Sequence, residues 1–324
     1  MTRTSPARRS AVNPPPRLFA VGGAHIDRRG RMTAPFVPGA SIPGTMTEET
    51  GGGTFNAIRA AVQRGVHATL MSVRGADSAG EMVAQAITEF GIADMSAVFL
   101  DRATPSYTAL VDRDGEVLAG LADMALYEVA FPKQLRRSKV REAVAEADAI
   151  FCDANLPRAA LETLTALGAG KPIYAIAISP AKATRLAGLL DRLACLYMNM
   201  REASALAALG AESGAEALAR ELQKRGLKAG VITAGAGPIT GFDRHGIFAL
   251  TPPKPRRVAD ATGAGDALAG ATTAAMMRGQ PLRAALREGM AAAMLTIESP
   301  AAVARIPEVL LAEALVLIAE PEPA

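Results

Sequence analysis

Asp260-Ala-Thr-Gly-Ala-Gly-Asp-Ala-Leu-Ala-Gly-Ala271 is the most informative stretch of this sequence. Its glycines at 263 and 265 permit a tight turn and the close approach of a ligand to the backbone. The apolar, alanine-rich run from Ala267 to Met277 predicts a helix that begins close to Asp266. A helix start presents unpaired N–H groups and the positive end of a dipole, so this stretch is typical of a phosphate-binding site.

Asp266 would place a carboxylate at the mouth of that predicted anion site. A carboxylate repels phosphate unless it has chemistry to perform, such as accepting the proton of an attacking hydroxyl group. The alternative interpretation is an ordinary N-cap, with the glycines serving only as a loop. The motif alone leaves both interpretations open.

The composition indicates a large globular protein and excludes several classes of function. The 324 residues suit one α/β domain with an appendage, and half of them are hydrophobic. Only 4% are aromatic, Trp is absent and the net charge is +3, so we expect no nucleic-acid partner. The sequence has no P-loop, no histidine or cysteine pattern typical of zinc sites, and no G-x-S-x-G elbow.

The cysteines and the N-terminal segment bear on where the protein works. Cys152 and Cys195 fall in apolar runs and predict buried free thiols, so we expect a cytoplasmic location. Residues 1–16 contain three consecutive prolines but no apolar core of a signal peptide, and they predict a loose tail. No apolar run clearly reaches the length of a membrane span, so we expect no membrane partner.

Beyond residue 16, strands alternate with helices, which predicts an α/β fold with a mainly parallel sheet and right-handed crossovers. The predicted strands are Arg17–Val21, His67–Val73, Ala149–Asp153, Pro172–Ala177, Cys195–Met198 and Gly230–Thr233. The predicted helices are Ala57–Arg64, Ser78–Phe90, Pro157–Gly168, Pro180–Leu190, Arg201–Leu209 and Ala215–Arg225, with three mostly apolar helices at the C-terminal end.

Two segments lack this alternation and predict a small sheet that stands off the main domain. Residues 28–50 are broken by prolines and favour short strands. Asp112-Arg-Asp-Gly115 is a turn signal between two apolar runs and predicts a hairpin. We therefore expect one domain over residues 17–324, with a lid from about 28–50 and 104–124 and a homodimer formed through that lid.

In an open parallel sheet, ligands bind beyond the carboxyl ends of the strands. The loops that leave those ends here are polar or contain glycine: Gly22–Asp27, Asp153–Asn155, Ser179–Lys182, Asn199–Glu202 and Thr233–Gly237. Their clustering predicts a site for a small molecule.

Four motifs, in this order along the chain, resemble those of the PfkB, or ribokinase-like, carbohydrate kinases. They are Gly51-Gly52-x-x-x-Asn56, Asn199-Met-Arg-Glu202, Thr233-x-Gly235-x-Gly237 and Thr262-Gly-Ala-Gly-Asp266. The resemblance implies a ribokinase-like three-layer α/β fold, in which helices flank a mainly parallel central sheet and a small β-sheet forms the lid. It also implies a kinase that uses ATP and Mg²⁺ and, in parts of the family, a monovalent cation such as K⁺.

The resemblance also assigns roles to single residues. Asp266 would accept the proton of the substrate hydroxyl group. The N–H groups that would hold the transferring phosphoryl group are those of Gly263, Ala264 and Gly265. The implied substrate-binding residues are Asp27, Gly51, Gly52, Asn56, Asp123 and Asn155, and the implied nucleotide-binding residues are Lys182, Asn199, Thr233, Gly235 and Gly237. Glu202 and Asn199 would orient Mg²⁺, in part through water, and Asp260 would lie near the monovalent cation.

Several of these residues also have simpler interpretations. Asp27 suits a turn cap, and Asn199 with Glu202 suits an exposed helix start. Asp123 suits the solvated end of a hairpin, and Lys182 suits a solvent-facing cation after a strand. The sequence leaves these alternatives open.

Within the family, the sequence most resembles the pseudouridine kinases. The stretches that carry this resemblance include Ser41-Ile-Pro-Gly44, Thr104-Pro-Ser-Tyr107, Ala122-Asp-Met124 and Asp153-Ala-Asn155. Ile42 and Phe55 depart from the pattern of that subgroup. The resemblance implies phosphorylation of the 5′-hydroxyl group of a ribosyl substrate, in particular pseudouridine to its 5′-phosphate, with Asp123 near the base. The alternatives are a kinase for another sugar or nucleoside, a dinucleotide-binding oxidoreductase, and a ligand-binding protein without catalysis.

Overall fold

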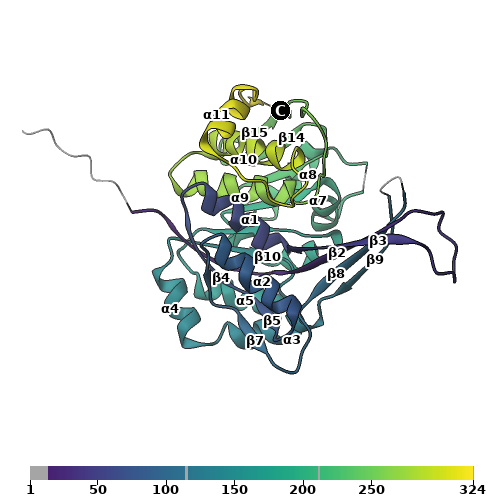
Figure 1. Cartoon of the computed structure of the whole chain (residues 1–324). Helices are drawn as coiled ribbons and strands as arrows, with labels where there is room; N and C mark the ends of the chain where they lie inside the picture. The colour runs from purple at the N-terminus through teal and green to yellow at the C-terminus, as the bar shows by residue number, and fades with distance from the viewer. Residues whose placement is uncertain (1–13, 114–115, 211, 324) are drawn as a thin grey trace, which may run out of the picture.

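The computed structural model describes residues 14–113, 116–210 and 212–323, and its body is a three-layer α/β/α structure (Figure 1). The strands of the central sheet follow the order β16 (Glu322–Pro323), β15 (Gly246–Leu250), β14 (Ile239–Asp243), β13 (Gly230–Thr233), β12 (Cys195–Asn199), β11 (Ile173–Ile176), β10 (Ala149–Asp153), β1 (Arg17–Val21), β4 (His67–Met71) and β6 (Ala93–Asp94). Neighbouring strands from β13 to β6 are parallel, and β14, β15 and β16 extend the sheet in antiparallel pairs. The expected mainly parallel sheet is confirmed.

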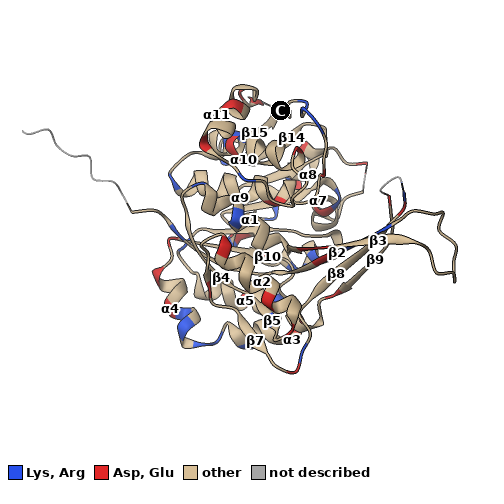
Figure 2. Cartoon of the chain, in the orientation of Figure 1, with Lys and Arg blue, Asp and Glu red and all other residues tan. Residues whose placement is uncertain are grey.

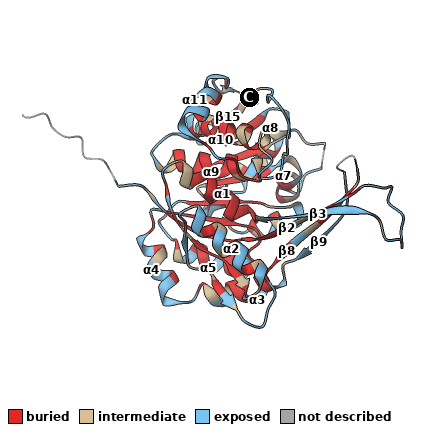
Figure 3. Ribbon diagram, viewed as in Figure 1, coloured by how far each residue is buried: buried red, intermediate tan, exposed pale blue. Residues whose placement is uncertain are grey.

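Alternating side chains of the strands build a hydrophobic core on each face of the sheet. In β1, Leu18 and Ala20 belong to one core, whereas Phe19 and Val21 belong to the other. The first core is covered by α1 (Gly53–Gln63), α2 (Ser78–Glu89), α9 (Ala264–Met277), α10 (Leu282–Ile297) and α11 (Glu308–Val316). The second is covered by α3 (Ala125–Gln134), α4 (Ser138–Glu146), α5 (Arg158–Leu167), α6 (Pro180–Ala183), α7 (Met200–Ala207) and α8 (Ala215–Lys224). Figure 3 shows the strands between these layers as mostly buried.

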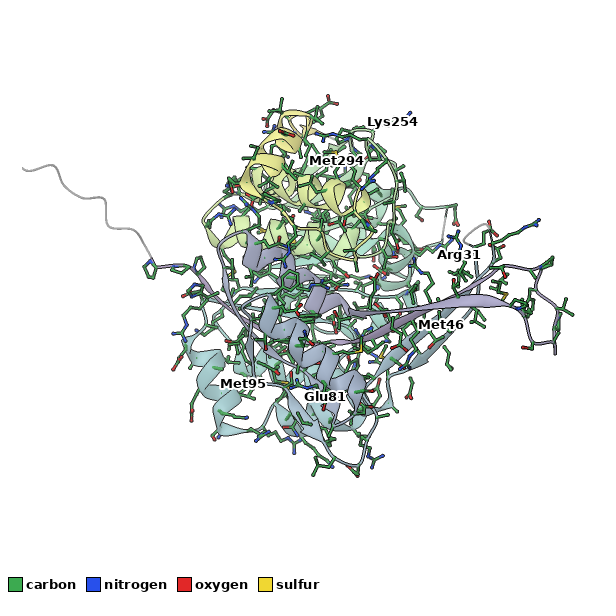
Figure 4. All side chains as sticks on the ribbon, viewed as in Figure 1. Arg31, Met46, Glu81, Met95, Lys254 and Met294 are labelled. Carbon is green, nitrogen blue, oxygen red and sulfur yellow. The ribbon has the colours of Figure 1, made fainter. Side chains whose placement is uncertain are left out.

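A second sheet projects from the body as the predicted lid (Figure 1). Its strand order is β3 (Gly44–Gly51), β2 (His25–Met32), β8 (Ser106–Val111) and β9 (Val117–Asp123). The central pair β2 and β8 is parallel, and the two outer pairs are antiparallel. Nearly all of β3 and all of β9 are exposed (Figure 3), and Figure 4 labels Arg31 and Met46 on this sheet. The hairpin tip at residues 114–115 and most of the predicted tail lie outside the described residues.

Four parts of the fold differ from the sequence-based expectation. The helix α1 begins at Gly53 and not at Ala57, because a buried hydrogen bond from the N–H group of Thr54 to Asp153 stabilises a first turn of low helix propensity. The predicted helix Pro180–Leu190 ends at Ala183, and 3₁₀ turns follow it. The helices α3 and α4 were not predicted, since Pro132 interrupts the pattern of α3. The predicted strand His67–Val73 ends at Met71, and a short pair of strands, β5 (Val73–Gly75) and β7 (Ala97–Phe99), follows.

The remaining global features are simple. Cys152 and Cys195 are both buried and free, as expected. Among the described helices, none combines the length and apolar character that spanning a bilayer requires. Lys and Arg are interspersed with Asp and Glu over the body (Figure 2).

Candidate active site

A cavity of about 550 Å³ lies where the carboxyl ends of the central strands meet the lid. Each of the five loops predicted to converge there contributes to its wall, through residues that include Asp27, Asn155, Lys182, Asn199 and Thr233. The lid contributes Tyr107 and Ala122, and the start of α9 contributes Gly265 and Asp266. The predicted meeting of these loops is therefore confirmed.

The helix α9 begins beside this cavity with a sharp turn at Gly263. The φ angle of Gly263 is 76°, and a Cβ atom there would lie 2.0 Å from the carbonyl oxygen of Ala302, so the turn requires glycine. The N–H groups of a first helical turn have no acceptor within the helix, and Gly265 presents this turn to the cavity. Gly263, and not Asp266, is the N-cap, so the interpretation of Asp266 as an ordinary cap is wrong.

The carboxylate of Asp266 lies in the cavity wall and has an unusual acidity. Burial raises the pKa of Asp266 to about 7. A hydrogen bond of 3.0 Å from Nδ2 of Asn56 to Oδ2 of Asp266 opposes this shift, while the negative charges of Asp153, Asp27 and Glu202 add to it. Such a group is partly ionised at neutral pH and is suited to accept a proton there.

Asn56 reaches Asp266 because of the way α1 begins. Gly52, the residue before the helix, has a φ angle of 112°, and a Cβ atom on it would lie 2.3 Å from the carbonyl oxygen of Gly23. The sharp turn at Gly52 places Asn56 in the first turn of α1, where it is 3% exposed and lines the cavity. Two motifs that lie 210 residues apart thus meet in one hydrogen bond.

The fully buried Asp153, at the end of β10, ties together three segments below the cavity. Its Oδ2 atom accepts hydrogen bonds from the backbone N–H groups of Gly23 (2.9 Å) and Thr54 (3.0 Å). Its Oδ1 atom accepts one from the N–H group of Asn155 (2.9 Å). The bond to Thr54 is the contact that starts α1 early, so Asp153 positions the turn that carries Asn56.

Asp27 and His25 lie two residues apart on β2 and face the cavity together. The Nε2 atom of His25 lies 3.3 Å from Oδ1 of Asp27, and its Nδ1 atom lies 3.1 Å from the hydroxyl group of Tyr127. Gly51, on the neighbouring strand, leaves room for Asp27, because a Cβ atom there would lie 1.9 Å from its Oδ2 atom. The arrangement presents an oriented carboxylate that can accept hydrogen bonds from hydroxyl groups.

Asn199 and Glu202 line another part of the wall and form a capping box at the start of α7. Asn199 donates from its backbone N–H group and from Nδ2 to the two oxygens of Glu202, over 2.8 and 2.9 Å. Burial raises the pKa of Glu202, and these hydrogen bonds oppose the shift. No group of three His, Cys, Asp or Glu side chains within the described ranges could hold a metal ion directly.

Lys182 and Asn155 meet in the wall of the cavity, so the side chain of Lys182 does not simply face solvent. The Nζ atom donates to Oδ1 of Asn155 over 2.6 Å, and both side chains line the cavity. Burial lowers the pKa of Lys182. The cation is therefore held inside the wall, within reach of an anionic ligand.

Asp260 does not present a free carboxylate to a monovalent cation. Its Oδ2 atom accepts a hydrogen bond of 2.7 Å from Arg29 of the lid, and its Oδ1 atom accepts one of 2.8 Å from the N–H group of Thr262. The guanidinium group already supplies positive charge at this carboxylate. The expected K⁺ contact of Asp260 is therefore not supported by this arrangement.

Some predicted site residues lie beside the cavity without lining it: Gly51, Asp123, Gly235, Gly237, Asp260, Gly263 and Ala264. Asp123 follows Ala122 and precedes Met124, both of which line the cavity, so alternation along the strand directs Asp123 elsewhere. The N–H group of Ala264 donates to the carbonyl oxygen of Ala261 over 3.3 Å. Asp123 is therefore not part of the cavity wall, and the N–H group of Ala264 is not free.

The chain resembles a known protein family over most of its length. The model of the pfkB family of carbohydrate kinases matches residues 16–309. The chain belongs to this family. It is therefore a kinase of the ribokinase type that acts on a sugar or a nucleoside.

Individual proteins that are similar to this chain are also kinases. A pseudouridine kinase of Escherichia coli (strain K12) is 26% identical over 274 residues, which cover 83% of this chain and 87% of the relative. The structure of a carbohydrate kinase from Agrobacterium tumefaciens is similar with a TM-score of 0.83 and 42% identity, covering 95% of this chain and 99% of that chain. Arabidopsis thaliana ribokinase, solved in complex with ribose and ATP, has the same fold with a TM-score of 0.81 at 21% identity, over 93% of this chain and 98% of that one.

Sequence reasoning missed several residues of this kinase site. His25 was detectable in principle, since its spacing from Asp27 on a strand puts both on one face. Ile178 lines the cavity at a φ angle of 71°, where the N–H group of Ser179 bonds to the carbonyl group of Ala177. This strained γ-turn at a branched residue has no sequence signal.

Proposed function

We propose that this pfkB-family kinase transfers the γ-phosphoryl group of ATP to the 5′-hydroxyl group of a ribosyl substrate, in particular pseudouridine. The observation that carries the proposal is the carboxylate of Asp266, which lies in the cavity at the start of α9 with a pKa raised to about 7. The complex of Arabidopsis ribokinase with ribose and ATP supports ATP as the donor. The relative named pseudouridine kinase supports the acceptor.

The proposed reaction is a direct displacement at phosphorus. The hydroxyl oxygen of the substrate bonds to the γ-phosphorus atom, the bond from that atom to the bridging oxygen of ADP breaks, and the hydroxyl proton passes to Asp266. Negative charge on the transferring phosphoryl group needs preorganised donors. We assign these to the N–H groups of Gly263 and Gly265, with Ala264 joining them once its bond to Ala261 is released.

The nucleotide and its metal ion would occupy the side of the cavity formed by α7 and β13. Glu202 is held by Asn199 and keeps lone pairs toward the cavity. Because Mg²⁺ retains several of its water molecules, such a carboxylate suits Mg²⁺ bound through water. When bound, Mg²⁺ neutralises charge on the phosphates. Thr233 lines the wall next to the turn of Gly235 and Gly237, and we assign these residues to the nucleotide. The half-buried ammonium group of Lys182 would contact a phosphate.

The acceptor would lie between the lid and the loops that carry polar side chains. Asp27, Asn56 and Asn155 offer acceptors and donors to the ribose hydroxyl groups. Tyr107, Ala122 and Met124 line the lid side of the cavity and offer it a largely apolar surface with one aromatic ring. A planar base would stack on such a surface, which favours a nucleoside over a free sugar.

One assay tests the proposal and its alternatives. ATP consumption is measured with pseudouridine, uridine, ribose and a hexose, and pseudouridine should give the largest kcat/KM. A preference for ribose or the hexose would leave the assignment as a kinase in place but contradict the assignment of a nucleoside substrate. ATP with Mg²⁺ should raise the melting temperature, whereas NAD and NADP should not. A shift with NAD alone would support the dinucleotide-binding alternative, and ATP binding without turnover on any acceptor would support a non-catalytic protein.

We also propose that two copies pair through their lids and that the enzyme works in the cytoplasm. The lid exposes large apolar side chains, with Met46, Val117 and Leu121 exposed by 57%, 61% and 71%. Apolar side chains gathered on one appendage favour association. A reducing compartment would keep both buried cysteines as thiols.

A further inference from the structure

Arg59 is a buried arginine without an ionic partner within ion-pair distance among the described residues. It belongs to α1, is 8% exposed, and its Cζ atom lies 5.1 Å from the centre of the Phe55 ring and 4.5 Å from that of Phe90. Burial lowers the pKa of Arg59 to about 10, and the charges that act on it are those of Glu49, Arg305 and Glu89. A buried charge of this kind is costly, so its contacts call for an explanation.

The contacts of Arg59 lead directly to the carboxylate of Asp266. Its Nη1 atom donates to Oδ1 of Asn56 over 3.2 Å and to the carbonyl oxygen of Thr50 over 3.3 Å. The Nδ2 atom of Asn56 then donates to Oδ2 of Asp266 over 3.0 Å. The three side chains form one chain of hydrogen bonds from a guanidinium group to a carboxylate.

This chain determines which way the amide of Asn56 points. Amide oxygen and nitrogen have nearly the same shape, so their hydrogen-bond partners decide the orientation. A guanidinium group only donates and an ionised carboxylate only accepts, so Arg59 and Asp266 impose the same orientation from opposite sides. Once Asp266 has accepted a proton it can also donate, and then Arg59 alone keeps the N–H groups of Asn56 directed toward it.

We propose that Arg59 is a positioning residue of the phosphoryl-transfer site, which locks the amide of Asn56 with its N–H groups toward Asp266 and the acceptor. The inference rests on the proposed role of Asp266 as the base. Arg59 contacts neither reacting atom, so it acts through Asn56. The locked amide stabilises the ionised carboxylate, and it presents a donor, not an acceptor, to the substrate.

The charges around Asp266 make this donor important. On α9 itself, Asp266 is the sole charged residue. The charged groups that act on it from other elements are Asp153 on β10, Asp27 on β2 and Glu202 on α7, and all three favour the protonated form. The hydrogen bond from Asn56 is the contact that opposes them. Loss of the orientation that Arg59 imposes on Asn56 should therefore move the acid limb of the pH–activity profile to higher pH.

The test compares Arg59→Met with Arg305→Met. Both arginines lie over the ring of Phe90, at 4.5 and 5.1 Å, but Arg305 is exposed and has no hydrogen bond to Asn56 among the described residues. Arg59→Met should lower kcat about tenfold or more, as expected for one oriented hydrogen bond to a charged group. It should also move the acid limb of the pH–activity profile to higher pH. Its KM for ATP should stay unchanged, and Arg305→Met should behave as the wild type.

A double-mutant cycle separates positioning from general support of the fold. In an Asn56→Ala background, Arg59→Met should cause no further loss of kcat, because the group through which it acts is gone. Losses that multiply would overturn the inference. If Arg59→Met does not fold, Arg59→Lys replaces it: the shorter lysine side chain holds its ammonium group farther from Asn56 and lacks the planar guanidinium group, so kcat should fall about threefold at an unchanged melting temperature.

The outcomes also separate this inference from the proposed function. A wild-type protein that phosphorylates no acceptor contradicts the proposed kinase reaction. An active wild type, together with folded Arg59 variants that keep the wild-type kcat and pH profile, overturns the role of Arg59 alone.

Discussion

Arg29 of the lid and Asp260 of the loop before α9 form an ion pair in which Nη1 lies 2.7 Å from Oδ2. The second guanidinium nitrogen donates to the hydroxyl group of Thr262 over 2.8 Å. Burial would raise the pKa of Asp260, but the hydrogen bonds from Thr262 and Arg29 lower it overall. The lid is thus joined to the segment that shapes the start of α9, although 231 residues separate the partners.

We predict that Arg29→Ala makes the activity sensitive to monovalent cations. The substitution removes the positive charge beside Asp260, and a small cation can then occupy its place. Since the pair is partly exposed, its direct contribution to folding is small, about 1 kcal/mol or less. The value of kcat/KM should fall severalfold in choline buffer and recover with K⁺, whereas the wild type should be indifferent. A wild type that itself requires K⁺ would contradict this account.

We predict that Asp266→Asn abolishes turnover and leaves ATP binding intact. Asparagine preserves the shape of the side chain but cannot accept the proton, and loss of a general base costs about 10²–10⁴-fold. Turnover and ATP-induced thermal shifts should be measured on the same preparation. In the wild type, kcat/KM should decline below about pH 7, where Asp266 becomes protonated. Turnover close to the wild-type rate would remove Asp266 from the role of base.

The same substitution should stabilise the protein at high pH. The pKa of Asp266 is raised to about 7 in the folded protein from an ordinary value of 3.8. Its favourable contribution to the free energy of unfolding is therefore complete below pH 3.8 and is lost as the pH rises through about 7. Asp266→Asn removes the cost of the buried charge, on the order of 2–4 kcal/mol. Its melting temperature should exceed that of the wild type at pH 8, and the difference should shrink toward pH 4. An equal difference at both pH values would contradict the shifted pKa.

We predict that Tyr107→Ala and Asp123→Ala have different effects on substrate choice. Tyr107 lines the cavity, whereas Asp123 does not, although both belong to adjoining strands of the lid. Tyr107→Ala should lower kcat/KM for pseudouridine about tenfold or more through loss of stacking, and should affect free ribose less. Asp123→Ala should change each substrate little and equally. A selective loss with pseudouridine in Asp123→Ala would show that Asp123 reaches the base, directly or through water.

We predict that Leu121→Glu disrupts the proposed lid dimer. Leu121 is 71% exposed on β9, so the substitution leaves the core of the protomer untouched while placing a charge in an apolar contact. Light scattering should give the mass of a dimer for the wild type and of a monomer for the variant. Glu142→Gln, on α4 at the side of the body away from the lid (Figure 1), serves as the control. A monomeric wild type would contradict the dimer.

Local patterns predicted much of this molecule. The strands β1, β10 and β13 have the predicted bounds, and α2 ends one residue early, because alternation and capping are properties of neighbouring residues. The loops at the carboxyl ends of the strands met as expected, since parallel topology dictates it. Prediction was poorer for the irregular α3 and for the strained turn at Ile178, where tertiary contacts override weak local preferences.

Short stretches of the sequence were enough to predict the order of the central parallel strands, the family, and the glycine turn that presents Asp266, because the chemistry of each stretch is local. The tertiary structure alone decided which distant side chains meet. It brought Arg29 to Asp260, linked Arg59 through Asn56 to Asp266, and turned Asp123 away from the cavity. The physical reason is that such contacts depend on strand register and on the packing of segments some 200 residues apart, which no local pattern encodes.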